Sequence, residues 1–207
     1  MRKLIKRLHG TLVFDRRISA IADAIASHLR PGDRLLDIGC GSGQLAALLY
    51  ERVRDLGITG VETLVREGTQ IPVTHYDGQR LPFPGGSFDV SILVDVLHHA
   101  DNALAVLDEA RRVSRRAVIV KDHLRTSRWS HQVLSFMDWV GNAPHRVNSR
   151  YHYFDTAEWA QMLAGAGLRV VVRNGQLGLY PWPTSLLFER DYHFVALLEP
   201  MRETVKS

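Results

Sequence analysis

The sequence has only one cysteine, no apolar run long enough to cross a membrane, and no concentrated basic tract. Cys40 alone excludes an intrachain disulfide framework and fits a reducing cytoplasm, where we expect the protein to be. Apolar runs such as residues 90–97 are interrupted by Asp or Ser, and they fall far short of the about 20 residues of a membrane span. Residues 1–8 are basic and amphipathic but lack the apolar core and cleavage site of a secretory signal.

The net charge and the length further limit the kinds of protein that this sequence can be. The net charge of +4 permits nucleic-acid binding but does not indicate it. The 207 residues suit one α/β domain, and the 45% hydrophobic and 23% charged fractions predict a self-sufficient core. The basic N-terminal stretch is compatible with peripheral contact to an anionic membrane surface, although a solvated helix face is the simpler interpretation. Nothing in the sequence indicates an oligomeric state.

The most informative segment joins an apolar run to a helical run through three glycines. Residues 35–38 are mostly apolar, Gly39, Gly41 and Gly43 follow, and residues 45–49 have helical composition. Because glycine has no Cβ, a ligand can approach this backbone closely. The loop ends at a helix N-terminus, whose N–H groups favour an anion. The segment therefore predicts a cofactor site.

Strand-like and helical runs alternate after the glycines, which is typical of βα units in a parallel sheet. Strands are expected at 34–39, 58–62, 71–76, 88–94 and 117–121, and helices at 1–30, 43–53, 101–114 and 127–140. Asp155 and Glu158 form a capping-box pattern that predicts a last helix ending near Gly165 or Gly167. Residues 168–172 and 192–198 have the composition of two closing strands.

Three blocks resemble known motifs. Residues 36–43, Leu-Asp-Ile-Gly-Cys-Gly-Ser-Gly, are similar to motif I of the class I S-adenosylmethionine-dependent methyltransferases. Residues 75–89, with Leu-Pro-Phe and Ser-Phe-Asp, and residues 93–99, which end in Leu-His-His, resemble further blocks of that family. The resemblance implies a doubly wound, Rossmann-like, mostly parallel seven-stranded α/β sheet of order 3-2-1-4-5-7-6, with strand 7 antiparallel.

The same resemblance implies S-adenosylmethionine as the cofactor. Glu62 would accept the ribose hydroxyls, Asp77 the adenine amino group, and Gly78 would supply a backbone N–H. A glycine loop alone would also suit NAD or FAD, and a solvated strand-end Glu is an ordinary feature. The implied cofactor-binding residues are Asp37, Gly39, Cys40, Gly41, Gly43, Glu62, Asp77, Gly78, Val94, Asp95 and His99.

Candidate catalytic residues are polar groups that follow the fourth and fifth strands or lie in the later insertion: His99, Asp122, His123 and Tyr151. Histidine titrates in the range that a general base needs, although a capping or packing role is an open alternative for His98 and His99. His145 and His152 are further candidates, and the aromatic cluster at 151–154 suits either an acceptor pocket or a packed connection. The spacing of His, Cys and carboxylates matches no familiar metal site, so we expect no metal.

The expected function is methyl transfer to O, N or C of a small, largely apolar organic acceptor. The expected division is a helical cap at 1–30, a cofactor-binding core at 31–124, an acceptor-side insertion at 125–154, and a closing helix and hairpin at 155–207. The insertion is rich in aromatic residues, which favours an organic acceptor, or a lid that packs on the sheet. A tRNA-directed methyltransferase and a non-catalytic cofactor-binding partner subunit are the alternatives. The modest charge counts against nucleic acid.

Overall fold

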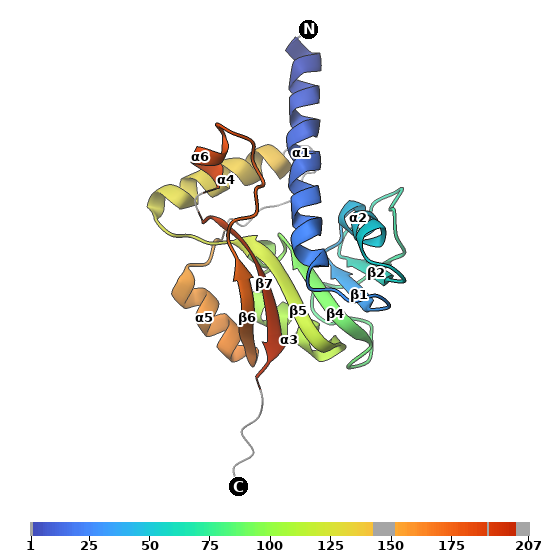
Figure 1. Cartoon of the computed structure of the whole chain (residues 1–207). Coiled ribbons are helices and arrows are strands. Elements are labelled where there is room, and N and C mark those ends of the chain that lie inside the picture. Colours follow the sequence, from blue (N-terminus) through green and yellow to red (C-terminus); the bar gives the residue numbers. More distant parts are fainter. Residues whose placement is uncertain (1, 143–151, 190, 202–207) are drawn as a thin grey trace.

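One seven-stranded sheet forms the centre of the computed structural model, which describes residues 2–142, 152–189 and 191–201 (Figure 1). Its strands are β1 (Arg34–Ile38), β2 (Gly57–Glu62), β3 (Val73–His75), β4 (Phe88–Val94), β5 (Ser114–His123), β6 (Leu168–Asn174) and β7 (His193–Pro200). Their order is β3-β2-β1-β4-β5-β7-β6, and β7 runs antiparallel to β5 and β6. The expected fold class is confirmed.

The helices cover both faces of this sheet. They are α1 (Arg2–Ala26), α2 (Gln44–Arg52), α3 (Ala103–Val113), α4 (Arg128–Asn142), α5 (Thr156–Gly165) and the short α6 (Ser185–Phe188), with a 3-10 turn at Leu97–His99. Leu36 and Val120 pack with α3 and α5 on one face, whereas Leu35 and Ile119 pack with α1 and α2 on the other. Successive strand residues thus feed two cores, which is why the central strands are apolar almost throughout.

The predicted elements agree with the structure apart from their ends and two short segments. Asp155 caps α5 through a complete capping box with Glu158, as predicted, and α5 ends at Gly165. β5 is longer than its apolar stretch because it begins at Ser114, immediately after α3, and continues to His123. The 3-10 turn and α6 were not predicted, since segments of three or four residues are too short for periodicity to reveal.

The carboxyl ends of the parallel strands meet at one edge of the sheet. β1 lies between β2 and β4, so chain order reverses between β1 and β4. In an open α/β sheet, this switch point is where a crevice for ligands forms. In Figure 1, α4 and α6 lie beyond this edge, and α1 runs past the sheet and extends well away from it. Within the described part of the chain, no helix is both long and apolar enough to cross a membrane.

Candidate functional site

Two glycines of the loop after β1 are packed closely against other residues, and the third faces open space. All three have left-handed backbones, with φ values of +74° at Gly39, +56° at Gly41 and +79° at Gly43. A Cβ at Gly39 would lie 2.6 Å from Val96, and one at Gly43 would lie 2.8 Å from Ile71. A Cβ at Gly41 would meet nothing within 4 Å. The loop therefore leaves room above Gly41, which fits a cradle for a bound group.

Glu62, at the end of β2, fixes this loop. One carboxylate oxygen accepts a hydrogen bond from Gly41 N at 2.9 Å, and the other accepts from Thr63 N at 2.8 Å. The side chain thus joins the second strand end to the glycine loop across 21 residues of sequence. A carboxylate placed there borders the space above Gly41. It is therefore close enough to accept hydrogen bonds from hydroxyl groups of a ligand in that space.

Asp37 lies beneath the loop in an unusual electrostatic position. Its side chain is buried, and among the described residues its Oδ2 atom has no hydrogen-bond partner. Burial, and then the negative charge of Glu62, raise the pKa of Asp37 to about 7. Burial and these two carboxylates also raise the pKa of the Cys40 thiol to about 12, so Cys40 is not a thiolate nucleophile at neutral pH.

Asp77 and Gly78 form a turn after β3. Asp77 Oδ1 accepts hydrogen bonds from Gln79 N at 2.8 Å and Arg80 N at 2.9 Å. These backbone donors lower the pKa of Asp77, and its carboxylate stays charged at neutral pH. Gly78 has a φ of +79°, which glycine adopts without strain. The turn holds a fixed hydrogen-bond acceptor in the position where the resemblance puts the adenine.

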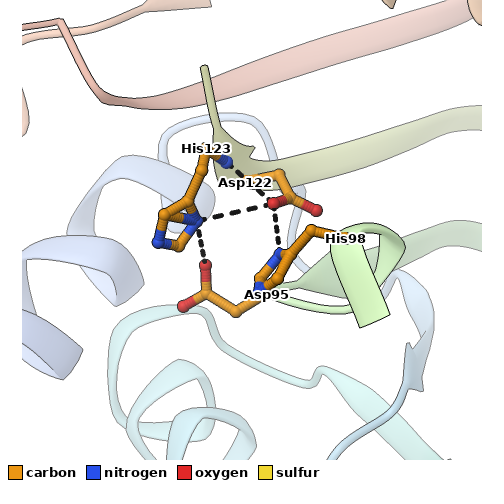
Figure 2. Close-up of side chains that lie close together, drawn as sticks. All are labelled: Asp95, His98, Asp122 and His123. Carbon is orange, nitrogen blue, oxygen red and sulfur yellow. Dashed lines mark hydrogen bonds and ion pairs between the residues drawn. The ribbon is translucent and has the colours of Figure 1, made fainter. Parts of the chain in front are cut away.

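The ends of β4 and β5 bring together a histidine and a carboxylate (Figure 2). His98 Nδ1 lies 2.6 Å from Asp122 Oδ1, and both side chains are buried. Asp122 also accepts hydrogen bonds from Leu97 N at 3.1 Å and His123 N at 2.7 Å. The carboxylate is therefore locked, and it fixes the tautomer and orientation of the His98 ring. Asp122 and His99 are catalytic candidates from the sequence, and the structure pairs Asp122 with the neighbouring His98.

The other two histidines lie against this pair. The His99 ring is 3.9 Å from the His98 ring and is half-buried, whereas His123 is buried. His123 Nδ1 lies 3.3 Å from Asp95 and 3.5 Å from Asp122. Burial, and then the charge of Lys121, hold the pKa of His123 well below its usual value, so its ring is neutral. A ring with so low a pKa is a weak base.

Asp95 and Lys121 form an ion pair beside the histidines. Lys121 is fully buried, and its Nζ lies 2.5 Å from Asp95 Oδ1. Burial opposes ionisation of Asp95, but Lys121, His98 and Arg17 outweigh it and lower the pKa of Asp95 to about 2. Asp95 has a left-handed backbone, with a φ of +56°, which costs about 1 kcal/mol in a non-glycine residue. The turn after β4 thus keeps a strained conformation that points a charged side chain at Lys121.

Asp95, His98, Asp122 and His123 also have the ligand types of a metal site, with their ligand atoms all within 4.8 Å of one another. Both carboxylates, however, already have strong partners. A metal ion would have to displace the Lys121 ammonium from Asp95 and separate His98 from Asp122. Both contacts would be lost, and the buried Lys121 would be left unpaired. The expectation that no metal is required stays a prediction.

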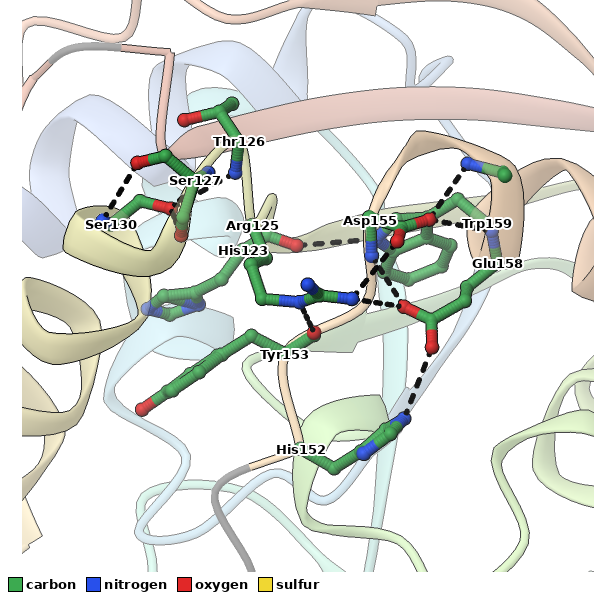
Figure 3. A network of polar contacts seen from close by, with 11 residues as sticks. His123, Arg125, Thr126, Ser127, Ser130, His152, Tyr153, Asp155, Glu158 and Trp159 are labelled. Atoms are coloured by element: carbon green, nitrogen blue, oxygen red, sulfur yellow. Dashed lines mark hydrogen bonds and ion pairs between the residues drawn. The ribbon is translucent and has the colours of Figure 1, made fainter.

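The aromatic insertion reaches the site through Tyr153 (Figure 3). Tyr151 and His145 lie outside the described residues, but the buried Tyr153 ring lies 5.6 Å from the rings of both His98 and His123. Arg125 Nε donates to Tyr153 O at 3.0 Å, and its Nη2 donates to Asp155 at 2.9 Å. Arg125 thereby ties the end of β5 to the N-terminus of α5. A pocket of about 410 Å³ opens here, lined by Arg125, Arg128, His131, Gln132, His152 and Tyr153.

A model of the methyltransferase domain matches residues 12–172. This chain belongs to the methyltransferase-domain family. The match covers the glycine loop, Glu62, Asp77 and the His98–Asp122 pair, so it confirms the resemblance to class I S-adenosylmethionine-dependent methyltransferases that the sequence motifs indicate. The likeness includes methyltransferases of quinone biosynthesis.

Individual relatives are similar over part of their length. This chain is 33% identical over 100 residues to the 27-O-demethylrifamycin SV methyltransferase of Amycolatopsis mediterranei, and the match covers 42% of this chain and 36% of that one. It is 33% identical over 101 residues to the ubiquinone/menaquinone biosynthesis C-methyltransferase UbiE of Nitrosospira multiformis, 43% of this chain and 41% of that one. The matches therefore span about two fifths of these relatives.

The fold has close counterparts among solved structures. The 1,6-didemethyltoxoflavin-N1-methyltransferase of Burkholderia thailandensis, with bound 1,6-didemethyltoxoflavin and S-adenosylhomocysteine, superposes with a TM-score of 0.66. The alignment covers 97% of this chain and 87% of that one, at 17% identity. At this identity the likeness concerns the fold alone.

Proposed function

We propose that this protein is an S-adenosylmethionine-dependent methyltransferase that moves a methyl group to a hydroxyl oxygen of a small, largely apolar organic acceptor. One juxtaposition carries the proposal. The glycine loop with Glu62 and the locked His98–Asp122 pair follow neighbouring strands, at the same edge of the sheet and around its switch point. The first group suits a nucleoside-bearing cofactor, and the second suits removal of a proton from a hydroxyl group.

The cofactor would lie across the ends of β1, β2 and β3. Glu62 would accept hydrogen bonds from the ribose hydroxyls, and Asp77 with Gly78 would bind the adenine edge. Asp37 would face the methionine ammonium group, whose positive charge suits a buried carboxyl. Cys40, Val94, Asp95 and His99 complete the proposed lining. The open space above Gly41 supports this placement, because a side chain there would fill it.

The chain would contribute alignment and one proton transfer. When bound, S-adenosylmethionine supplies a methyl carbon on a sulfonium sulfur, whose positive charge disappears as the methyl group leaves. His98 would take the acceptor's hydroxyl proton through Nε2 while Asp122 holds the proton on Nδ1. His99, His123 and Tyr153 would line the acceptor side and exclude water, with residues 125–154 as the acceptor-side insertion and residues 1–30 as its cap.

Two measurements test the proposed function in order. Calorimetric titration should show binding of S-adenosylmethionine and of S-adenosylhomocysteine, and the loss of both would refute the cofactor assignment. Labelled methyl groups should then move from the cofactor to a small-molecule fraction of a cell extract. Label in the RNA fraction would favour the tRNA-directed alternative, and binding without any transfer would favour a partner subunit.

The raised pKa of Asp37 makes cofactor binding depend on pH. Its carboxyl, with a pKa of about 7, is mostly neutral at mildly acidic pH. A bound ammonium group favours the ionised form, so binding releases a proton in this range. The affinity for S-adenosylhomocysteine should therefore rise by up to about tenfold for each pH unit from about pH 5 to about pH 7, and then level off. Calorimetry in buffers of different ionisation enthalpy measures both the affinity and the released proton.

Asp37→Asn provides the control for this pH dependence. The amide has almost the same shape but no charge, so binding should be weak and nearly flat over the same range. A wild-type affinity that does not change with pH, or an equal slope in the variant, would show that Asp37 does not face the ammonium group.

A further inference from the structure

Arg17 is a cation without a matching anion at the acceptor side of the site. Its guanidinium lies 5.3 Å from the centre of the Tyr180 ring. Its Nε atom is buried and, among the described residues, has no hydrogen-bond partner. No carboxylate of the described residues forms an ion pair with it. An arginine keeps its charge, so burying one of its nitrogens without an acceptor is costly.

The groups around Arg17 do not supply that anion. Its charge contributes to the lowered pKa values of Asp95, His123 and His193, which places it near all three. Asp95 is already bound to Lys121, and the pKa of each histidine lies well below the usual value, mainly because of burial. The region therefore contains two basic side chains, Arg17 and Lys121. Its two carboxylates already have partners, since Asp95 binds Lys121 and Asp122 binds His98.

The position of Arg17 favours the acceptor over the cofactor as its partner. Tyr180 lies in the connection between β6 and β7, and His193 begins β7 with its ring 4.8 Å from the His123 ring and 5.9 Å from the Tyr180 ring. These elements lie on the β5 and β7 side of the switch point, across from the glycine loop. The carboxylate of the cofactor would have the N–H groups at the start of α2 available on the other side.

We propose that the acceptor carries an anionic group, a carboxylate or a phosphate, that binds to Arg17. The inference rests on the proposed function, since it concerns the acceptor of the same site. Arg17 binds the anion by charge-assisted hydrogen bonds, and Lys121 adds a favourable field. The rings of Tyr180, His193, His123 and Tyr153 pack one against the next beside Arg17, and this aromatic row suits an apolar body. The acceptor class is thus a largely apolar hydroxyl compound with one acidic group.

The test compares anionic and neutral probes of one shape. Calorimetric titrations of benzoate, phenyl phosphate and benzamide are carried out on the full chain saturated with S-adenosylhomocysteine. A charged hydrogen bond is worth about 1.5–3 kcal/mol, so at least one anion should bind about 10-fold to 100-fold more tightly than benzamide. The comparison of benzoate with phenyl phosphate shows which anion the site takes, and inorganic phosphate shows whether the ring contributes.

Arg17→Gln should remove the preference for the anion, and Arg17→Lys should keep part of it. Arg16→Gln is the matched control, because Arg16 is the next residue on α1 and its exposed side chain donates to Gly178 O at 3.1 Å. Arg16→Gln should retain the wild-type preference. Circular dichroism of each variant confirms that α1 and the sheet are folded.

The outcomes separate this inference from the proposed function. Loss of S-adenosylhomocysteine affinity in Arg17→Gln, with the probes unaffected, would overturn the inference and assign Arg17 to the cofactor's carboxylate. Binding of all three probes with equal affinity, or no anion binding that depends on Arg17, would also overturn it. With each of these results, S-adenosylhomocysteine binding by the wild-type protein leaves the proposed function in place.

Discussion

Gly41→Arg should lower the affinity for S-adenosylmethionine and S-adenosylhomocysteine by at least about 100-fold, which corresponds to about 3 kcal/mol. A Cβ at Gly41 would meet no protein atom within 4 Å, so the arginine side chain extends into the open cradle rather than into the core. It would occupy the ligand's space, and its positive charge would oppose a sulfonium. The left-handed backbone, with a φ of +56°, adds about 1 kcal/mol of strain but does not prevent folding. Calorimetry measures the affinity, and thermal unfolding measures the strain.

Gly32→Arg is a matched control for this variant. Gly32 has a φ of +81°, and a Cβ there also meets nothing within 4 Å, but it precedes β1 and therefore lies at the opposite edge of the sheet. The control introduces the same charge and similar backbone strain away from the crevice, and it should bind the cofactor normally. Normal cofactor binding by Gly41→Arg, or an equal loss of affinity in both variants, would mean that the glycine loop does not bind the cofactor.

The helices and strands could be predicted from the sequence because their apolar runs have clear ends. β1 and β4 are buried on both faces, and glycine or proline residues follow several of the runs, so the strands stood out without tertiary information. The order of the strands has a different origin. Periodicity says nothing of which strands are neighbours, and the order 3-2-1-4-5-7-6 came from the resemblance carried by the motifs.

The cofactor half of the site is local in sequence, whereas the catalytic half is not. The glycine loop, Asp77 and Gly78 act through their own backbone turns, so short motifs reveal them. His98 and Asp122 are 24 residues apart and meet because β4 and β5 pair in parallel, with Val94 beside Lys121. Which of the two adjacent histidines faces Asp122 is decided by the 3-10 turn at Leu97–His99. A sequence pattern cannot resolve such a rotation.

The buried cations were the least visible feature of the sequence. Lys121 follows an apolar run, and a lysine in such a place is usually exposed to solvent. Only the structure shows that Lys121 is fully buried against Asp95. Arg17 lies among the other basic residues of α1, and nothing in its spacing sets it apart from Arg16. Its relation to Tyr180 depends on a contact between the first helix and the last connection, more than 160 residues away.

His98→Gln should reduce kcat by about 100-fold to 10,000-fold, which is the usual contribution of a general base. Glutamine keeps a polar group next to Asp122 but cannot accept the acceptor's proton. The wild-type rate should fall as the pH is lowered, since a protonated imidazole no longer takes up a proton, and this acid limb should be absent from the variant's residual activity. Initial rates of labelled methyl transfer to the accepting extract fraction measure both effects.

Cofactor binding separates a catalytic role of His98 from a structural one. S-adenosylhomocysteine affinity should stay within about threefold in His98→Gln, because the ring lies after β4 and not in the glycine loop. His28→Gln, a change in the turn after α1 at the other edge of the sheet, should leave rate and pH profile as in the wild type. If the His98→Gln variant keeps the wild-type kcat and the acid limb, His98 is not the general base. The hydroxyl acceptor would then lose its main support, because an amine or an enolate acceptor needs only alignment and exclusion of water.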